Sequence, residues 1–129
     1  MNRTAEEVGK NLQSVRERIA LACSRCGRKP EEIRIMAVTK TFSADRVRSA
    51  YAAGLRLFGE NRVQEAAAKY GPLLEDRQLP GLELHLVGHL QRNKAKKAAE
   101  LFSCVQSIDK LETAQALERE CSALGRSID

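Results

Sequence analysis

The sequence IRIMAVTK at residues 33–40 is an apolar, β-branched run that stops at Thr39 and Lys40. A run of this kind between turn signals is typical of a buried strand. Pro30 closes the segment before it, and Ser43, a residue type favoured at helix N-caps, follows it. The pattern therefore predicts a strand at 33–39, a helix at 44–53, and Lys40 in the turn between them.

The position of Lys40 makes it a candidate nucleophile. The positive end of the following helix dipole disfavours an ammonium group and favours the free amine. A free lysine amine forms Schiff bases with carbonyl compounds. The alternative is a solvated loop lysine, so the choice depends on the residues that surround it.

The length and composition limit the classes of protein to consider. The chain has 129 residues, fewer than the roughly 200 to 250 of a closed eight-stranded α/β barrel. Hydrophobic residues make up 43% and charged residues 30%, without a long apolar run, so no membrane span is expected. The N-terminus lacks the apolar stretch of a signal peptide, and a cytoplasmic location is expected.

The net charge of +5 is compatible with nucleic-acid binding, but aromatic residues are only 4% of the chain. Few side chains are therefore present on which bases would stack. The densest basic stretch, QRNKAKK at 91–97, is interpreted as a solvated helix face. The cysteines match neither a disulfide framework nor a zinc site and are interpreted as small buried residues: Cys23, Cys26, Cys104 and Cys121.

The rest of the chain predicts one partial α/β-barrel domain over residues 1–129. A leading amphipathic helix is expected within 1–27, because Thr4 and Glu7 form a capping box and Gly27 is placed to end the helix. Four strand-helix units follow over 33–125, and 126–129 resemble the start of a fifth strand. The expected strands are 33–39, 55–59, 82–87 and 104–108, and the expected helices are 44–53, 62–74, 93–101 and about 111–124, the last after the capping pair Asp109 and Glu112. Alternating strands and helices predict a parallel sheet.

In such a sheet, all the strand-to-helix turns open on one side, where functional sites gather. The turns expected here carry an amine, an amide, an imidazole and carboxylates: Lys40 and Thr41, Glu60 and Asn61, His89 and Gln91, Ser107 and Asp109. Taken singly, Asn61 and Asp109 are ordinary helix N-caps, and Glu60 suits a helix dipole. Their convergence favours a binding site. The sequence contains neither a G-x-G-x-x-G fingerprint nor a P-loop.

Three ordered motifs resemble the N-terminal motifs of the YggS-like pyridoxal phosphate homeostasis proteins. They are AVTK at 37–40, FGENRVQEA at 58–66 and HLVGHLQRNK at 85–94. The resemblance covers about residues 8–128. It implies the N-terminal portion of a TIM-type (β/α)8 barrel that binds pyridoxal phosphate (PLP) and is related to the N-terminal domain of alanine racemase.

The resemblance also implies roles for individual residues. Lys40 matches the lysine that holds PLP as a Schiff base, and Asn61 matches the asparagine beside the cofactor ring. Val38 and His89 are expected to line the same pocket. Leu84 departs from the aromatic residue usual in the family. The family's phosphate-binding loops and the arginine near the ring nitrogen come from later strands, which this chain does not contain.

The function expected from the resemblance is PLP homeostasis without substrate turnover, with PLP-accepting enzymes as partners. A PLP-dependent racemase-like or decarboxylating enzyme is disfavoured, because Tyr51 and Tyr70 fall on helices away from the turns and no second acid/base group is evident. A third alternative is a nucleic-acid-binding or interaction module that uses 91–97. An unfinished barrel predicts self-association or pairing with a complementary C-terminal half.

Overall fold

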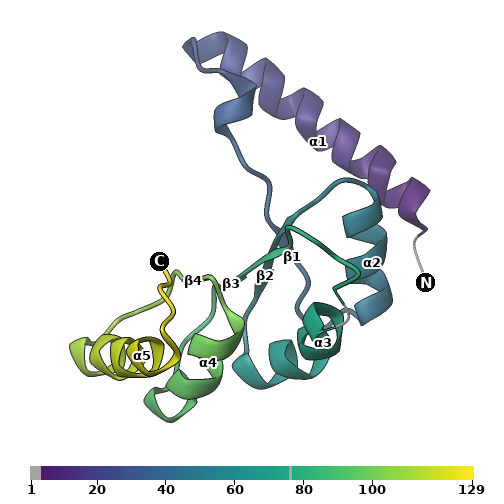
Figure 1. Ribbon diagram of the computed structural model, residues 1–129. Coiled ribbons are helices and arrows are strands. Elements are labelled where there is room, and N and C mark those ends of the chain that lie inside the picture. Colours follow the sequence, from purple (N-terminus) through teal and green to yellow (C-terminus); the bar gives the residue numbers. More distant parts are fainter. Residues whose placement is uncertain (1–3, 76) are drawn as a thin grey trace.

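The computed structural model describes residues 4–75 and 77–129. Its centre is a four-stranded parallel sheet in the order β1-β2-β3-β4 (Figure 1). The strands are β1 (Ala37–Val38), β2 (Leu57–Glu60), β3 (Glu83–Leu86) and β4 (Cys104–Val105). The helices are α1 (Ala5–Cys26), α2 (Ala44–Ala52), α3 (Val63–Glu75), α4 (Ala95–Leu101) and α5 (Leu111–Leu124), with short 3-10 turns η1 (Pro30–Glu32) and η2 (Arg92–Lys94). The predicted α/β fold of four strand-helix units behind a leading helix is confirmed.

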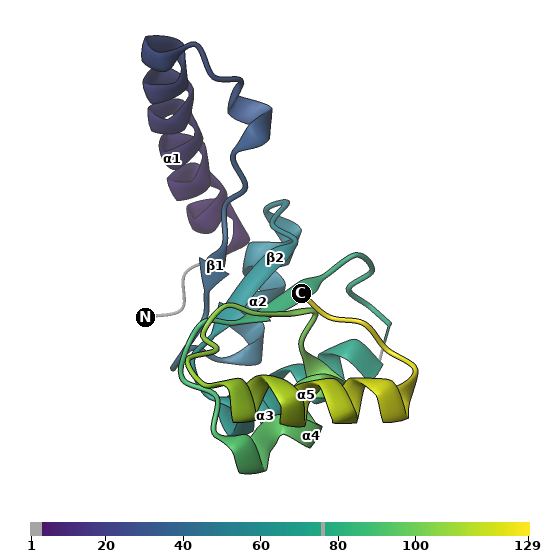
Figure 2. The same cartoon turned by 90° about the vertical axis from the view of Figure 1, so that its left-hand side faces the viewer.

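Each strand pairs with the strand that precedes it in the chain. Ala37 pairs with Phe58, Phe58 with Leu84, and Leu86 with Val105. Helices α2–α5 gather on one side of the sheet (Figures 1 and 2), as right-handed crossovers between parallel strands require. The largest fully buried side chains fill the space between the sheet and these helices: Tyr70, Phe58, Phe102, Leu73, Leu86 and Leu90.

The helix ends follow the capping signals of the sequence in most places. Thr4 and Glu7 form the predicted capping box, and Gly27 ends α1 with a left-handed φ of 70°. Ser43 occupies the N-cap position of α2, although its side chain makes no capping hydrogen bond. The predicted capping role of Asp109 is wrong, because Lys110 is the N-cap of α5 and extends the loop by one residue.

The strands are shorter than the apolar runs that predicted them. The run at 33–39 contributes only Ala37 and Val38 to β1, and that at 104–108 contributes only Cys104 and Val105 to β4. The interpretation of 33–39 as a buried strand is wrong in part, since Val38 is 44% exposed. Within the described residues β1 has a strand neighbour on one side alone, so one of its edges has no strand partner.

The last residue of the chain lies beside β4. The backbone N–H of Asp129 donates to the carbonyl of Ser103 at 3.1 Å, and the N–H of Val105 donates to the carbonyl of Asp129 at 2.8 Å. These two bonds to alternate residues have the pattern of a parallel strand pair. A strand starting within 126–129 remains a prediction that fits this geometry.

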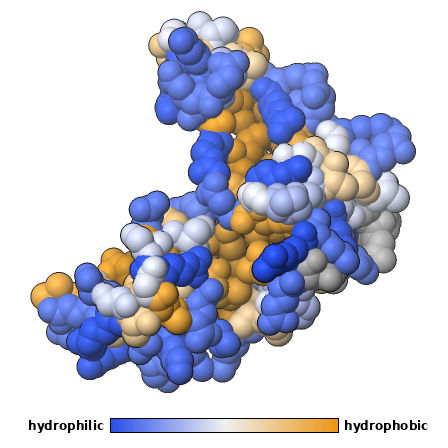
Figure 3. Space-filling view, in the orientation of Figure 1, coloured by the Kyte–Doolittle hydropathy of each residue, from blue (hydrophilic) through white to orange (hydrophobic). Residues whose placement is uncertain are grey.

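Helix α1 packs against α2 and extends away from α3–α5 (Figures 1 and 2). A groove of about 590 Å³ separates it from the segment that leads into β1, with Ile19, Ile33, Ile35 and Leu57 among the lining residues. Figure 3 shows hydrophobic surface in the hollow between α1 and the sheet. No helix among the described residues is both long and apolar enough to cross a membrane.

The cysteines occupy different environments. Cys23 and Cys121 are buried, as predicted. Cys26 is exposed and Cys104 is only partly buried, so the interpretation of all four as buried residues is wrong for these two. Cys26 is the last residue of α1.

Candidate functional site

The ends of the strands lie in order along one edge of the sheet. The N–H of Thr39, just after β1, donates to the carbonyl of Gly59 in β2 at 3.0 Å. The N–H of Val87, just after β3, donates to the carbonyl of Glu60 at 2.9 Å. The turns that follow β1, β2 and β3 are therefore adjacent, which is the arrangement expected at the carboxyl edge of a parallel sheet.

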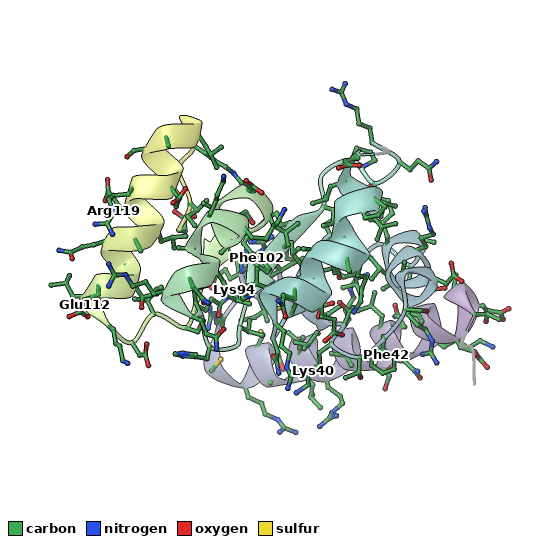
Figure 4. All side chains as sticks on the ribbon, turned by 90° about the horizontal axis from the view of Figure 1, so that it is seen from below. Lys40, Phe42, Lys94, Phe102, Glu112 and Arg119 are labelled. Atoms are coloured by element: carbon green, nitrogen blue, oxygen red, sulfur yellow. The ribbon has the colours of Figure 1, made fainter. Side chains whose placement is uncertain are left out.

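Lys40 lies in the first of these turns, and its side chain is exposed. Figure 4 labels Lys40 and Phe42 in the segment after β1 and Lys94 in η2, seen from below. Val38 precedes Lys40 by two residues and pairs with Gly59 across β1 and β2. Side chains alternate along a strand, and Thr39 faces the helices, so Val38 lies on the open face of the sheet.

Asn61 and His89 line one polar pocket of about 500 Å³ between the turns after β2 and β3. The other lining residues are Arg62, Val63, Gln64, Gly88, Gln91 and Lys94. The structure thus brings together two of the four predicted site residues. Lys40 and Val38 are not among the residues that line this pocket, and they lie at the neighbouring strand end.

Two contacts involve residues that line this pocket. A β-carbon at Gly88 would overlap the backbone carbonyl of Asn61, so the two turns touch through their main chains. Nδ1 of His89 lies 3.8 Å from Oδ2 of Asp109, and both side chains are more than half exposed. This contact is an ion pair only when the imidazole is protonated. Asp109 is thus beside His89, as the convergence of strand ends predicts.

A buried polar cluster lies directly behind the Lys40 turn. The hydroxyl of Thr39 donates to Oε1 of Glu60 at 2.9 Å, since a carboxylate only accepts. The Tyr70 hydroxyl in α3 lies 2.6 Å from Oγ1 of Thr39 and is therefore the donor to it. Burial raises the pKa of Tyr70, which keeps this phenol protonated. The end of β1 is thus tied to both β2 and α3.

Lys69 is the central cation of this cluster. Its Nζ donates to the carbonyl of Thr39 at 2.6 Å and to Oε1 of Glu60 at 2.6 Å, and Oε1 of Glu65 lies 3.4 Å away. The Lys69 side chain is 7% exposed, and that of Glu60 is fully buried. A buried carboxylate without a counter-charge costs several kcal/mol, so Lys69 and Glu60 depend on each other. Oε2 of Glu60 has no hydrogen-bond partner among the described residues.

Glu65 contacts the residue that follows Lys40 in the same turn. Its Oε1 accepts a hydrogen bond from the backbone N–H of Thr41. This bond is the main cause that lowers the pKa of Glu65, and the nearby Lys69 ammonium adds to it. Thr41 has φ of 66°, a left-handed conformation that is rare for a β-branched residue. The carboxylate therefore stabilises an unusual backbone next to Lys40.

The sequence alone did not identify this cluster. Lys69 and Glu65 have the spacing of an exposed i, i+4 pair, and Tyr70 is read as a helix residue away from the turns. One signal was present: Glu60 alternates with the buried Phe58, which places its side chain toward α3. A carboxylate on that face requires a cation from the helix that covers it.

Comparison with known proteins places these features in context. No family model matches the chain. The chain is 43% identical over 111 residues to the pyridoxal phosphate homeostasis protein of Escherichia coli K12, covering 86% of this chain and 47% of that protein. It is 42% identical over 113 residues to the protein of the same name from Pseudomonas aeruginosa, covering 88% of this chain and 47% of the relative. The chain thus spans about half the length of these curated relatives.

Solved structures agree with this similarity. PipY of Synechococcus elongatus PCC7942, determined with PLP bound, superposes with a TM-score of 0.78 at 42% identity, over 94% of this chain and 51% of PipY. A protein of unknown function from Bifidobacterium adolescentis superposes with a TM-score of 0.85 at 30% identity, over 96% of this chain and 53% of its own. In both cases, the matched part is about half of the solved chain.

Proposed function

Because the chain is homologous over 86% of its length to the pyridoxal phosphate homeostasis proteins, of which it spans about half, we propose that it binds PLP and serves intracellular PLP homeostasis. The observation that carries the proposal is the placement of Lys40 at a strand end beside the turn of Asn61, in a fold that matches PLP-bound PipY. The proposal includes a cytosolic setting, with PLP-accepting enzymes as recipients.

In this proposal, the Lys40 amine holds the cofactor as a Schiff base. The amine nitrogen bonds to the aldehyde carbon, and water leaves. The residues present suit this group: the amine is exposed, Val38 offers apolar surface beside it, and Asn61 and His89 offer polar groups at the adjacent turns. When bound, the cofactor would supply the aldehyde for the imine. The residues of the protein would orient the cofactor.

Binding by this chain is expected to be weak. The described residues contain no glycine-rich loop for the cofactor phosphate. Each missing charge-assisted hydrogen bond to a phosphate is worth roughly 1.5 to 3 kcal/mol. Tight binding by an isolated monomer would show that other residues hold the phosphate, with Arg62 and Lys94 in the polar pocket as the first candidates to test.

The first experiment identifies the lysine that reacts. The protein is incubated with PLP, reduced with borohydride, and the modified residue is mapped by mass spectrometry. We expect the label at Lys40 and its loss in Lys40→Arg, which keeps the charge but provides no reactive amine. Label found mainly at Lys94, Lys96 or Lys97 would contradict the proposal.

We further propose that the chain carries PLP without turning over a substrate. Racemisation needs acid/base groups on both sides of the imine carbon. The hydroxyl of Tyr70 is buried against Thr39, and that of Tyr51 donates to the carbonyl of Pro80, so neither tyrosine is free for that role. The alternative, a racemase-like enzyme, predicts turnover where the carrier predicts none.

The two readings are separated by supplying the PLP-treated protein with a panel of L- and D-amino acids. Chirality, carbon dioxide release and keto-acid formation are followed over time. The carrier reading predicts no steady conversion of any amino acid. Multiple-turnover conversion that disappears in Lys40→Arg would establish the enzyme instead.

A further inference from the structure

We propose that Lys69 and Glu65 of α3 are positioning residues for Lys40: they hold the strand-to-helix turn in the conformation that presents its amine. The inference rests on the proposed function, because it assigns these residues a role in the reaction of that amine. Neither side chain is placed to react itself, since both are engaged with the backbone on either side of Lys40.

The two residues form hydrogen bonds to the backbone on both sides of Lys40. Lys69 donates to the carbonyl of Thr39, immediately before Lys40, and Glu65 accepts from the N–H of Thr41, immediately after it. They lie one helical turn apart on α3 and approach each other at 3.4 Å. A single rigid helix therefore fixes both peptide groups that flank Lys40, which limits how the lysine backbone can turn.

The contact of Lys69 depends on its burial, and the contact of Glu65 depends on the backbone geometry of Thr41. Lys69 is fixed by the fully buried Glu60, so its position is set by the end of β2. Thr41 has the left-handed φ of 66°, which a threonine adopts at a cost, and the bond to Glu65 offsets that cost. Without this acceptor, Thr41 is expected to adopt a right-handed or extended conformation. That change would alter the direction in which the Lys40 side chain points.

The first test compares two changes at Glu65, whose side chain is 32% exposed, with circular dichroism and thermal melting to check that each variant is folded. Glu65→Ala removes the acceptor for the Thr41 N–H, whereas Glu65→Gln keeps a carbonyl oxygen at the same place. We expect Glu65→Ala to lower the equilibrium constant for imine formation at Lys40 by about two- to tenfold, the loss of one hydrogen bond, and Glu65→Gln to restore most of it.

The second test concerns Lys69. Lys69→Met leaves Glu60 buried without a cation, so it is combined with Glu60→Gln to keep the protein folded. The double variant loses the bond to the Thr39 carbonyl. We expect reduced imine formation at Lys40 in this variant as well, while circular dichroism and thermal melting show a folded chain.

A cofactor-independent measurement separates positioning from general stability. Trace acetylation with acetic anhydride, read lysine by lysine by mass spectrometry, reports how each amine is presented. We expect the labelling of Lys40 relative to Lys10 and Lys97 to change in Glu65→Ala and to return in Glu65→Gln. Lys10 and Lys97 lie on exposed faces of other helices and serve as internal controls.

The outcomes for the two proposals are distinct. If the wild-type protein forms no imine at Lys40, the proposed function fails, and the acetylation comparison alone decides the positioning role. If imine formation and relative labelling of Lys40 are the same in wild type, Glu65→Ala and the folded double variant, the positioning role is overturned. A fall in imine formation and a change in the relative labelling of Lys40 in Glu65→Ala, both reversed in Glu65→Gln, support it.

Discussion

At the scale of single residues, Gly88 is the glycine of the described residues with the least room for a side chain. A β-carbon there would overlap the carbonyl oxygen, the carbonyl carbon and the Cα of Asn61, all backbone atoms that cannot rotate away. Gly88→Ala must therefore push apart the turns that carry Asn61 and His89. We expect a loss of about 1 to 3 kcal/mol in the free energy of unfolding, measured by urea denaturation.

Gly9 in α1 is the matched control for Gly88. Apart from the adjoining residues and the nearby backbone of α1 itself, no atom of the described residues lies within 4 Å of a β-carbon built at this glycine. Gly9→Ala is expected to stabilise the protein by about 0.4 to 1 kcal/mol, because alanine loses less backbone entropy in a helix. Equal effects of the two substitutions would show that the contact between Gly88 and Asn61 is not as close as described.

At the scale of elements, α3 contacts the sheet through the buried ion pair of Lys69 and Glu60 as well as through apolar packing. Lys69→Met leaves the fully buried Glu60 carboxylate uncompensated, and we expect a destabilisation of about 3 to 5 kcal/mol in thermal or urea unfolding. Adding Glu60→Gln should recover much of that loss. A small effect of Lys69→Met alone would contradict the dependence of Glu60 on this cation.

Lys97 provides the comparison for Lys69. It forms an exposed pair with Glu100 at 3.2 Å within α4. Exposed helix pairs contribute about 0.3 to 0.5 kcal/mol, so Lys97→Met should change stability little. The difference between Lys69→Met and Lys97→Met reports the effect of burial, because the same substitution is made in both cases on a helix that covers the sheet.

Local signals in the sequence were sufficient for most of these elements. The capping box at Thr4 and the left-handed glycines Gly27 and Gly125 act within a few residues, so they end helices where the pattern predicts. Strand length depends on neighbours that the local pattern does not contain. The apolar run at 33–39 therefore overestimated β1, of which only Ala37 and Val38 meet β2 in register.

The candidate site also has one part that the sequence predicts and one part that depends on contacts between distant residues. Lys40, Asn61 and His89 follow from the rule that functional groups gather at the carboxyl ends of parallel strands. The cluster behind them does not, because Tyr70 meets Thr39 across 31 positions of the chain and Lys69 meets it across 30. A charged residue on a helix is most often solvated, and only the packing of α3 on the sheet shows that Lys69 is not.

At the scale of the whole molecule, the sheet has an open face and an open edge. Val38 in β1 is 44% exposed, and the far edge of β1 has no strand partner within residues 4–75 and 77–129. Ile108, in the loop between β4 and α5, adds an apolar side chain that is 38% exposed. Such surfaces promote association. We expect sedimentation velocity to show a concentration-dependent increase in mass, weakened by Ile108→Asn. A monomer that stays monodisperse over a wide concentration range would contradict this.

The strand order has a consequence for the way the chain acquires its structure. Paired strands are always consecutive, and pairs such as Ala37 with Phe58, Leu57 with Glu83 and His85 with Cys104 are separated by only 21, 26 and 19 positions. Short loops close at little entropic cost and at high speed. Each unit can thus dock on its predecessor while the ribosome is still adding the next, so that the Lys40 turn is assembled once α3 has been synthesised.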